Sequence, residues 1–346
     1  MVNVDYILGT SFTWIQQKDG NISVHLCQSA FTEFTAHWFS VQIAKKFPNM
    51  TQYRFGFPID SIPPVDPLDP DINRWRHVYQ IIVGCVNWLA TCTRPDIPLV
   101  LTFLTSYRNY PHPQHYKAAV HVLKYLTSTN EYGISFHSDS LATIQAFNHF
   151  PRHQNREAYT EATAPSPSEC HQLTAYCDAN WGGKFVSAFE DGTQLELFKF
   201  RSLSGFLICL CSGPISWKSI LQNKTALISC EAEIVATNKC TTELQSIKHR
   251  PHDIGIPEVY SCTIIYNDNK AAVKWVASVT SKVIKHLNLE ENIVREWHQS
   301  KDVDVEHIPG IINPSNIFTK EMKDNTHLRN LRDSRMVSSS FPDAQS

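Results

Sequence analysis

The spacing of apolar residues in residues 1–135 predicts a small hairpin followed by helices. Alternation over Tyr6–Ile15 and over Ile22–Cys27, with Lys18-Asp19-Gly20-Asn21 as a turn between them, indicates two antiparallel strands. Beyond them, apolar residues recur every three to four positions, which is the helical period. The segments with this period are Phe31–Ile43, Trp75–Thr91, Pro98–Tyr107 and His115–Leu126.

The C-terminal half alternates short apolar runs with helical patterns. In chain order the pattern predicts three strands, a helix, a fourth strand, helices, a fifth strand and a last short helix. This order is typical of an α/β fold with a mixed sheet flanked by helices. The expected strands are Leu173–Cys177, Gly205–Cys211, Ile215–Lys218, Val259–Tyr266 and Val303–Ile308. The expected helices are Ser229–Ile247, Asn269–Ala277 and Val283–Gln299, and a last one that Asn313 caps before Pro314.

Two stretches interrupt these patterns. Phe55–Asp71 is rich in proline and has no periodicity, so we expect a linker inside the N-terminal part. Residues 138–170 are polar and rich in His, Pro and Ser, which makes them the best domain boundary. The expected organisation is an N-terminal region over 1–137, a linker over 138–170, an α/β domain over 171–325 and a tail over 326–346.

Composition places the chain among ordinary folded proteins, since 42% of its residues are hydrophobic and 18% are charged. No apolar run approaches the roughly 18 residues that span a bilayer, and the N-terminus lacks a basic-then-apolar leader. We therefore expect an intracellular protein without a membrane partner. The ten cysteines form no Cys-x-x-Cys pair, and we expect them to be reduced core residues.

Charge does not favour a nucleic-acid partner. The formal net charge is -2, and 19 basic residues balance 19 acidic residues between His171 and Met336. Proteins that bind nucleic acid usually carry a basic excess. Any such role must therefore rest on local patches.

Three carboxylates carry the most specific chemical signal. Asp178 follows a predicted strand, Glu233 lies in the first turn of a predicted helix, and Asp268 follows the next strand. Acids are costly to desolvate unless they are paired or bind a cation. If they converge, they form a site for divalent cations, which cleave phosphodiesters; the alternative is separate capping and turn roles. Glu233 is preferred over Glu231 because Ile234 continues the buried face of the helix beside it.

Short motifs occur in both halves of the chain. They are Thr93-Arg94-Pro95-Asp96, Leu123-Lys124-Tyr125-Leu126, Tyr132-Gly133-Ile134-Ser135-Phe136, Tyr176-Cys177-Asp178-Ala179, Ser204-Gly205-Phe206, Gly213-Pro214-Ile215-Ser216-Trp217, Glu231-Ala232-Glu233, Asp268-Asn269 and Ile317-Phe318-Thr319-Lys320. With these motifs in this order, residues 5–335 resemble the C-terminal part of a copia-type LTR-retrotransposon polyprotein. The order of strands and acids in the second half also resembles ribonuclease H.

The resemblance implies a ribonuclease H-like domain that uses two Mg²⁺ or Mn²⁺ ions to cut the RNA strand of an RNA–DNA hybrid. Asp178, Glu233 and Asp268 would hold the metal, and Asn316 would complete the catalytic set where the family has aspartate. Residues 1–135 would be the end of a reverse transcriptase beyond its palm, a smaller and mostly helical thumb- or connection-like region. The resemblance also implies that other parts of the polyprotein are partners. The protein would be located in the cytoplasm, in virus-like particles or in the nucleus.

Two features limit these expectations. No Asp-Asp dipeptide occurs in the chain, so we expect no DNA synthesis. Asn316 removes a negative charge from the site, which leaves a second hypothesis open, that of a non-catalytic nucleic-acid-binding or structural relic. A cluster of basic residues follows Asp268, and it could bind the phosphates of a hybrid or be an ordinary solvated helix face. Its residues are Lys270, Lys274, Lys285 and His286.

Overall fold

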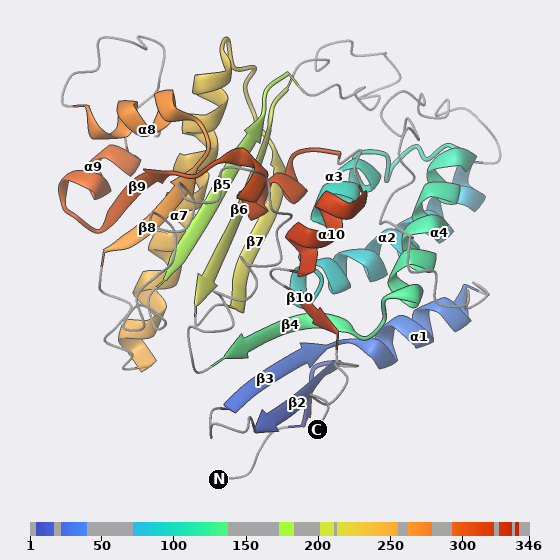
Figure 1. Cartoon of the computed structure of the whole chain (residues 1–346). Coiled ribbons are helices and arrows are strands. Elements are labelled where there is room, and N and C mark those ends of the chain that lie inside the picture. The colour runs from blue at the N-terminus through green and yellow to red at the C-terminus, as the bar shows by residue number, and fades with distance from the viewer. Residues whose placement is uncertain are drawn as a thin grey trace.

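The computed structural model describes residues 5–16, 22–39, 72–137, 173–182, 201–210, 213–254, 262–278, 293–321, 325–333 and 336–338 (Figure 1). The strands of this part of the chain form two five-stranded sheets. The expected linkers at 55–71 and 138–170 and the expected turn at 18–21 lie outside the described residues.

The first sheet is antiparallel and has the order β1-β2-β3-β4-β10. Its strands are β1 (Tyr6–Ile7), β2 (Thr10–Gln16), β3 (Ile22–Cys27), β4 (Tyr132–His137) and β10 (Met336–Ser338). Along β3 buried residues alternate with more exposed ones, as expected of a strand with one covered face. The expected hairpin is therefore present, whereas β4 and β10 were not expected as strands.

Four helices accompany this sheet, and three of them form its main core. They are α1 (Ser29–Trp38), α2 (Ile72–Cys92), α3 (Pro98–Ser106) and α4 (Pro113–Ser128). Tyr79 of α2, Leu104 of α3 and Leu123 of α4 are almost completely buried in one cluster. Each of these helices was expected from its apolar spacing.

A buried ion pair explains the motif Thr93-Arg94-Pro95-Asp96. The guanidinium of Arg94 donates two hydrogen bonds to Asp96, of 2.9 Å and 2.7 Å, and both residues are almost completely buried. Tyr125 of α4 donates to Asp96 as well, at 2.5 Å. A buried charge pair with all these partners fixes the turn between α2 and α3 against α4.

The second sheet is mixed and has the order β7-β6-β5-β8-β9. Its strands are β5 (Thr174–Asn180), β6 (Leu203–Leu210), β7 (Gly213–Leu221), β8 (Thr263–Asn267) and β9 (Val303–His307). The first three pair antiparallel, and β8 and β9 are added in parallel beside β5. This is the expected ribonuclease H-like mixed sheet with flanking helices.

Helices cover one face of the second sheet, and a shorter layer covers the other. On one face lie α7 (Ser229–Ile254), α8 (Lys270–Ala277) and α9 (Ile293–Gln299), whose apolar residues join the strands in one core (Figure 1). The other face packs against the 3-10 turn η7 (Pro314–Phe318) and α10 (Asn325–Asp333).

Contacts also join the two sheets and their helices. Trp217 of β7 donates its indole N–H to the carbonyl of Ala90 at 2.7 Å, and Thr102 of α3 donates to the carbonyl of Ser219 at 2.9 Å. The segment expected as a tail, 326–346, contains all of α10 but its first residue, and also β10, which pairs with β4. The division into domains stays a prediction. None of the described helices is long and apolar enough to cross a membrane.

Candidate metal centre

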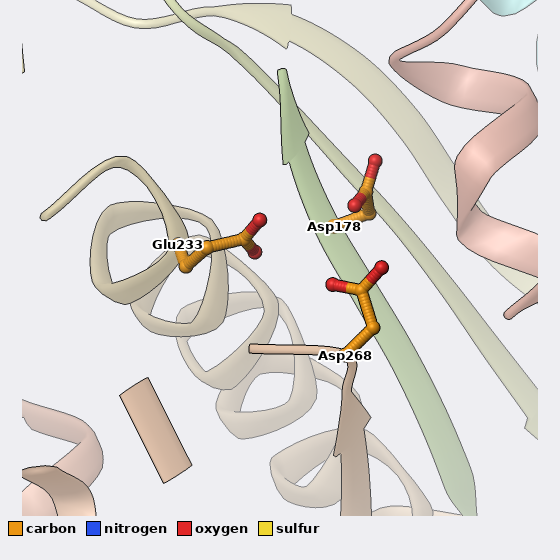
Figure 2. Close-up of side chains that lie close together, drawn as sticks. All are labelled: Asp178, Glu233 and Asp268. Carbon is orange, nitrogen blue, oxygen red and sulfur yellow. The ribbon is translucent and has the colours of Figure 1, made fainter. Parts of the chain in front are cut away.

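The three acids expected to act together come from three separate elements. Asp178 lies on β5, Glu233 in the first turns of α7, and Asp268 directly after β8. One ligand oxygen of each lies within 4.8 Å of those of the others, and Figure 2 shows the three carboxylates pointing toward one another. The parallel pairing of β5 with β8 brings Asp178 and Asp268 together, because the carboxyl ends of parallel strands meet at one edge.

Burial makes this cluster electrostatically unfavourable without a cation. Asp178 is completely buried and Glu233 is 6% exposed. Burial raises the pKa of Asp178 to about 6, although the ammonium of Lys320 acts in the opposite direction. Burial, with the charges of Asp178 and Asp268, raises the pKa of Glu233 to about 9. Convergent carboxylates whose charge one ammonium offsets only in part fit a hard divalent cation.

Asn267 positions the carboxylate of Glu233. This residue ends β8 and is completely buried. Its amide N–H₂ donates to Oε2 of Glu233 at 3.1 Å, and its Oδ1 accepts from the backbone N–H of Asn269 at 2.7 Å. One side chain thus orients Glu233 and the turn that carries Asp268. Sequence reasoning missed it, although a polar residue ending an apolar run was a visible signal.

The Ile317-Phe318-Thr319-Lys320 motif lies on the other side of Asp178. Thr319 donates a hydrogen bond to Oδ2 of Asp178, and Lys320 donates to its Oδ1 at 2.9 Å. Lys320 also donates to Oδ1 of Asn316 at 2.9 Å. The amide N–H₂ of Asn316 donates to the carbonyl of Gly310, which leaves only its oxygen facing the lysine. Asn316 is therefore linked to Asp178 through Lys320, and its catalytic role stays a prediction. The contacts of Thr319 and Lys320 were not foreseen.

Two glycines allow this close approach. Gly205 of β6 is paired with Asp178, and a Cβ there would lie 2.6 Å from Cβ of Phe318 and 2.7 Å from Cγ2 of Thr319. A Cβ on Gly310 would lie 2.7 Å from Oδ2 of Asp268. A side chain at Gly205 would therefore push η7 and Thr319 away from β6, and one at Gly310 would push the carboxylate of Asp268 aside. The Ser204-Gly205-Phe206 motif thus has a steric explanation.

The remaining candidate residues lie around this centre. Glu231 accepts a hydrogen bond from the backbone N–H of Leu227 at 2.7 Å, which is a local role at the start of α7. Lys270 and Lys274 are exposed on α8, which begins two residues after Asp268. Lys285 and His286 lie outside the described residues. A phosphate-binding role for these four stays a prediction.

Trp181 lies on the surface near the metal centre, although a tryptophan after a predicted strand is usually a core residue. It is 53% exposed, and its indole N–H donates to the carbonyl of Ala226 at 3.0 Å. It follows Asp178 by three residues, beyond the end of β5. Aromatic type alone did not distinguish a core position from a surface position past the end of a strand.

Comparison with known proteins identifies relatives of the chain, although no family model matches it. The Pol polyprotein of transposon RE2 from Arabidopsis thaliana is 27% identical over 231 residues, which are 66% of this chain and 13% of that protein. The Pol polyprotein of transposon TNT 1-94 from Nicotiana tabacum is 23% identical over 250 residues, which are 72% of this chain and 15% of that protein. Secreted RxLR effector protein 161 from Plasmopara viticola is 30% identical over 165 residues, which are 48% of this chain and 87% of that protein.

The strand order and these relatives define a ribonuclease H-like protein of retroelement type. Its homologues include the retrovirus-related Pol polyproteins of the plant retrotransposons RE2 and TNT 1-94. The chain spans only 13% of the RE2 polyprotein, so the activities of such a whole polyprotein do not transfer to it directly.

Among solved structures, LC11-RNase H1 from compost is similar, at 16% identity with a TM-score of 0.31, over 43% of this chain and 93% of that one. The prototype foamy virus protease-reverse transcriptase is 14% identical with a TM-score of 0.29, and the match covers 51% of this chain and 22% of that one. Scores this low add no argument about function.

Proposed function

We propose that this protein cleaves the RNA strand of RNA–DNA hybrids by divalent-metal-dependent hydrolysis. The observation that carries the proposal is the convergence of Asp178, Glu233 and Asp268, with ligand oxygens within 4.8 Å of one another. The family supports it, since the relatives are Pol polyproteins. DNA synthesis is not part of the proposal, because the chain has no Asp-Asp dipeptide.

The residues of the centre divide into ligands and positioning groups. Asp178, Glu233 and Asp268 would hold two Mg²⁺ or Mn²⁺ ions, with the neutral oxygen of Asn316 as a weaker ligand. Such ions, when bound, activate water and offset the charge on the phosphate under attack. Asn267 holds Glu233 in place, and Thr319 does the same for Asp178.

The substrate would be recognised by shape. An A-form duplex is read through its phosphates and 2′-hydroxyls, with little base specificity. Lys270 and Lys274 are exposed on α8, close in sequence to Asp268, and would contact phosphates. Lys285 and His286 would extend the same contact.

Cleavage of a labelled hybrid by the full-length chain tests the proposal. Asp268→Asn should abolish Mg²⁺-dependent cleavage, because it removes one ligand charge. The thermal unfolding midpoint should stay nearly unchanged or rise, since the substitution relieves repulsion among crowded acids. Asp304→Asn is the matched control: this residue lies on β9 and its side chain is 49% exposed.

Three outcomes are distinct. Cleavage by the wild type and by Asp304→Asn, but not by Asp268→Asn, supports the proposal. Undiminished cleavage by Asp268→Asn places the activity elsewhere. Hybrid binding without cleavage by any variant, in Mg²⁺ or Mn²⁺, favours a non-catalytic relic instead.

A further inference from the structure

One ammonium group lies among the oxygens of the metal centre. Nζ of Lys320 is 2.9 Å from Oδ1 of Asp178 and 2.9 Å from Oδ1 of Asn316, and it is 3.9 Å from Oδ2 of Asp268. It therefore contacts one of the three acids and the family's fourth position at hydrogen-bonding distance. Lys320 is the second residue after η7 and is not part of any described helix or strand.

The lysine and a divalent ion need the same oxygens. Ions such as Mg²⁺ bind oxygen at about 2.0–2.1 Å. An ion bound to both Oδ1 of Asp178 and Oδ1 of Asn316 would lie between them, where the ammonium lies now. The two cations would also repel each other. Occupation by Lys320 and occupation by an ion at this position are therefore mutually exclusive.

The other side of the centre is arranged differently. Glu233 accepts its hydrogen bond from the neutral amide of Asn267. Asp268 is separated from Nζ of Lys320 by 3.9 Å, which is beyond hydrogen-bonding distance. An ion between Glu233 and Asp268 would not need to displace the lysine.

The lysine is also able to leave. Its side chain is 42% exposed, whereas Asp178 beneath it is completely buried. A long, flexible side chain at this exposure can rotate into solvent without opening the core. The hydrogen bond from Thr319 would continue to hold Asp178 in place.

We propose that Lys320 is a tethered cation that occupies the second of two metal positions and must leave before a second divalent ion binds. This inference rests on the proposed metal-dependent function and refines it. The two ions bind unequally: the Glu233–Asp268 position fills first, and the Asp178–Asn316 position fills in competition with Lys320. The lysine thereby sets the metal concentration at which the centre is complete.

The competition also involves Asn316. An aspartate there would attract an ion more strongly, but it would hold the ammonium of Lys320 more strongly too. The effect of Asn316→Asp on the second ion is therefore small while Lys320 is present and larger once the lysine is removed. Such non-additivity is the signature of two groups that share one site.

Binding of Mn²⁺ to the full-length protein without nucleic acid tests the inference, with free Mn²⁺ measured by electron paramagnetic resonance. The variants are Lys320→Met, Asn316→Asp and the double variant. Lys239→Met is the matched control, since it removes the same charge from an exposed position of α7. Thermal unfolding is recorded for each protein.

Lys320→Met should tighten the second Mn²⁺ by roughly tenfold or more, the size expected for one charge-assisted contact. The first Mn²⁺ and the Lys239→Met control should change little. Equal affinity for the second ion in wild type and Lys320→Met, with a lower unfolding temperature in the variant, would show that Lys320 only pins η7 to β5. That result overturns the inference and leaves the proposed function intact. Absence of Mn²⁺ binding in every variant overturns both.

Discussion

At the scale of single residues, the centre combines an amide, Asn316, where the family pattern has an acid, with Lys320, which belongs to the shared motif. Asn316 contributes an oxygen without charge, and Lys320 contributes a charge that competes with metal. Both features weaken the hold on a second ion. The centre should therefore depend on metal type and concentration more strongly than a site with four carboxylates.

Asn316→Asp should raise Mg²⁺-dependent cleavage of the hybrid. Loss of one charge-assisted ligand costs on the order of 1.5–3 kcal/mol. If the full interaction is made in the transition state, this corresponds to a change of roughly 10- to 100-fold in rate. Lys320 reduces this gain, so the larger effect should occur in the Lys320→Met background. Single-turnover rates at low Mg²⁺ measure both.

Mn²⁺ provides the control for this prediction. Because it binds nitrogen and oxygen ligands more tightly than Mg²⁺ does, it should partly compensate in the unmutated protein. If Asn316→Asp brings no gain in either background, and if Mn²⁺ and Mg²⁺ give the same rates, the metal centre is not limiting. The relic interpretation would then be preferred.

The sequence contains the acids in recognisable places but not their partners. Asp178 was expected just after a strand but lies within β5, two residues before its end, whereas Asp268 follows β8 as expected. Glu233 lies in the first turns of α7, and the buried face of that helix separates it from Glu231. The contact of Thr319 with Asp178 joins residues 141 positions apart. No local pattern encodes such a pairing, because it depends on how η7 packs on the sheet.

At the scale of elements, the spacing of apolar residues predicts long helices. It also predicts strands that are buried on both faces or that alternate buried and exposed residues. It missed β4 and β10, which are strands because of what they pair with. β4 lies between β3 and β10, and β10 is only three residues long. A run of that length has no period to detect, so its conformation follows from the neighbouring strand.

The pairing of β3 with β4 includes a buried histidine. Nδ1 of His25 lies 2.9 Å from Oγ of Ser135, and Nε2 lies 3.3 Å from the carbonyl of Glu131. A carbonyl only accepts, so Nε2 carries the proton and Nδ1 accepts from the serine in the neutral ring. Burial lowers the pKa of His25, although the hydrogen bond to Glu131 acts in the opposite direction.

Stability should therefore fall in mild acid through this residue. A histidine whose folded pKa is below its unfolded value of 6.5 stabilises the fold above pH 6.5. That contribution is lost as the pH falls from 6.5 through the folded pKa, with a slope of up to about 1.4 kcal/mol per pH unit for one proton. Denaturant unfolding between pH 7.5 and pH 5 measures it.

His25→Gln should flatten this dependence, because glutamine does not titrate. His37→Gln is the control, since His37 is exposed on α1 and should leave the slope as it is. An unchanged slope in His25→Gln would assign the acid sensitivity to other groups.

At the scale of the whole molecule, the end of the chain connects the metal centre with the first sheet. Leu328 and Leu331 of α10 pack in one cluster with Ile317 and Phe318 of η7. Beyond them, the guanidinium of Arg332 lies 4.4 Å from the centre of the ring of Tyr132, next to the pairing of β10 with β4. The turn that carries Asn316, Thr319 and Lys320 thus rests on an element that the first sheet anchors.

This support should be measurable as a coupling between stability and metal binding. Leu331 is completely buried. Leu331→Ala should lower the free energy of unfolding by about 2–5 kcal/mol, as other buried Leu→Ala changes do. Because η7 loses part of its packing, the affinity for Mn²⁺ should fall as well, although Leu331 is not itself a ligand. Denaturant unfolding and Mn²⁺ titration of the same sample measure both quantities.

Leu227→Ala is the matched control, because this leucine is 68% exposed and lies just before α7. It should change neither quantity appreciably. If Leu331→Ala lost stability but bound Mn²⁺ as tightly as the wild type, the position of η7 would be independent of α10. The centre would then be supported by its own sheet alone. A joint loss would instead show that the packing of the C-terminal helix helps to set the affinity of a site built on β5, α7 and β8.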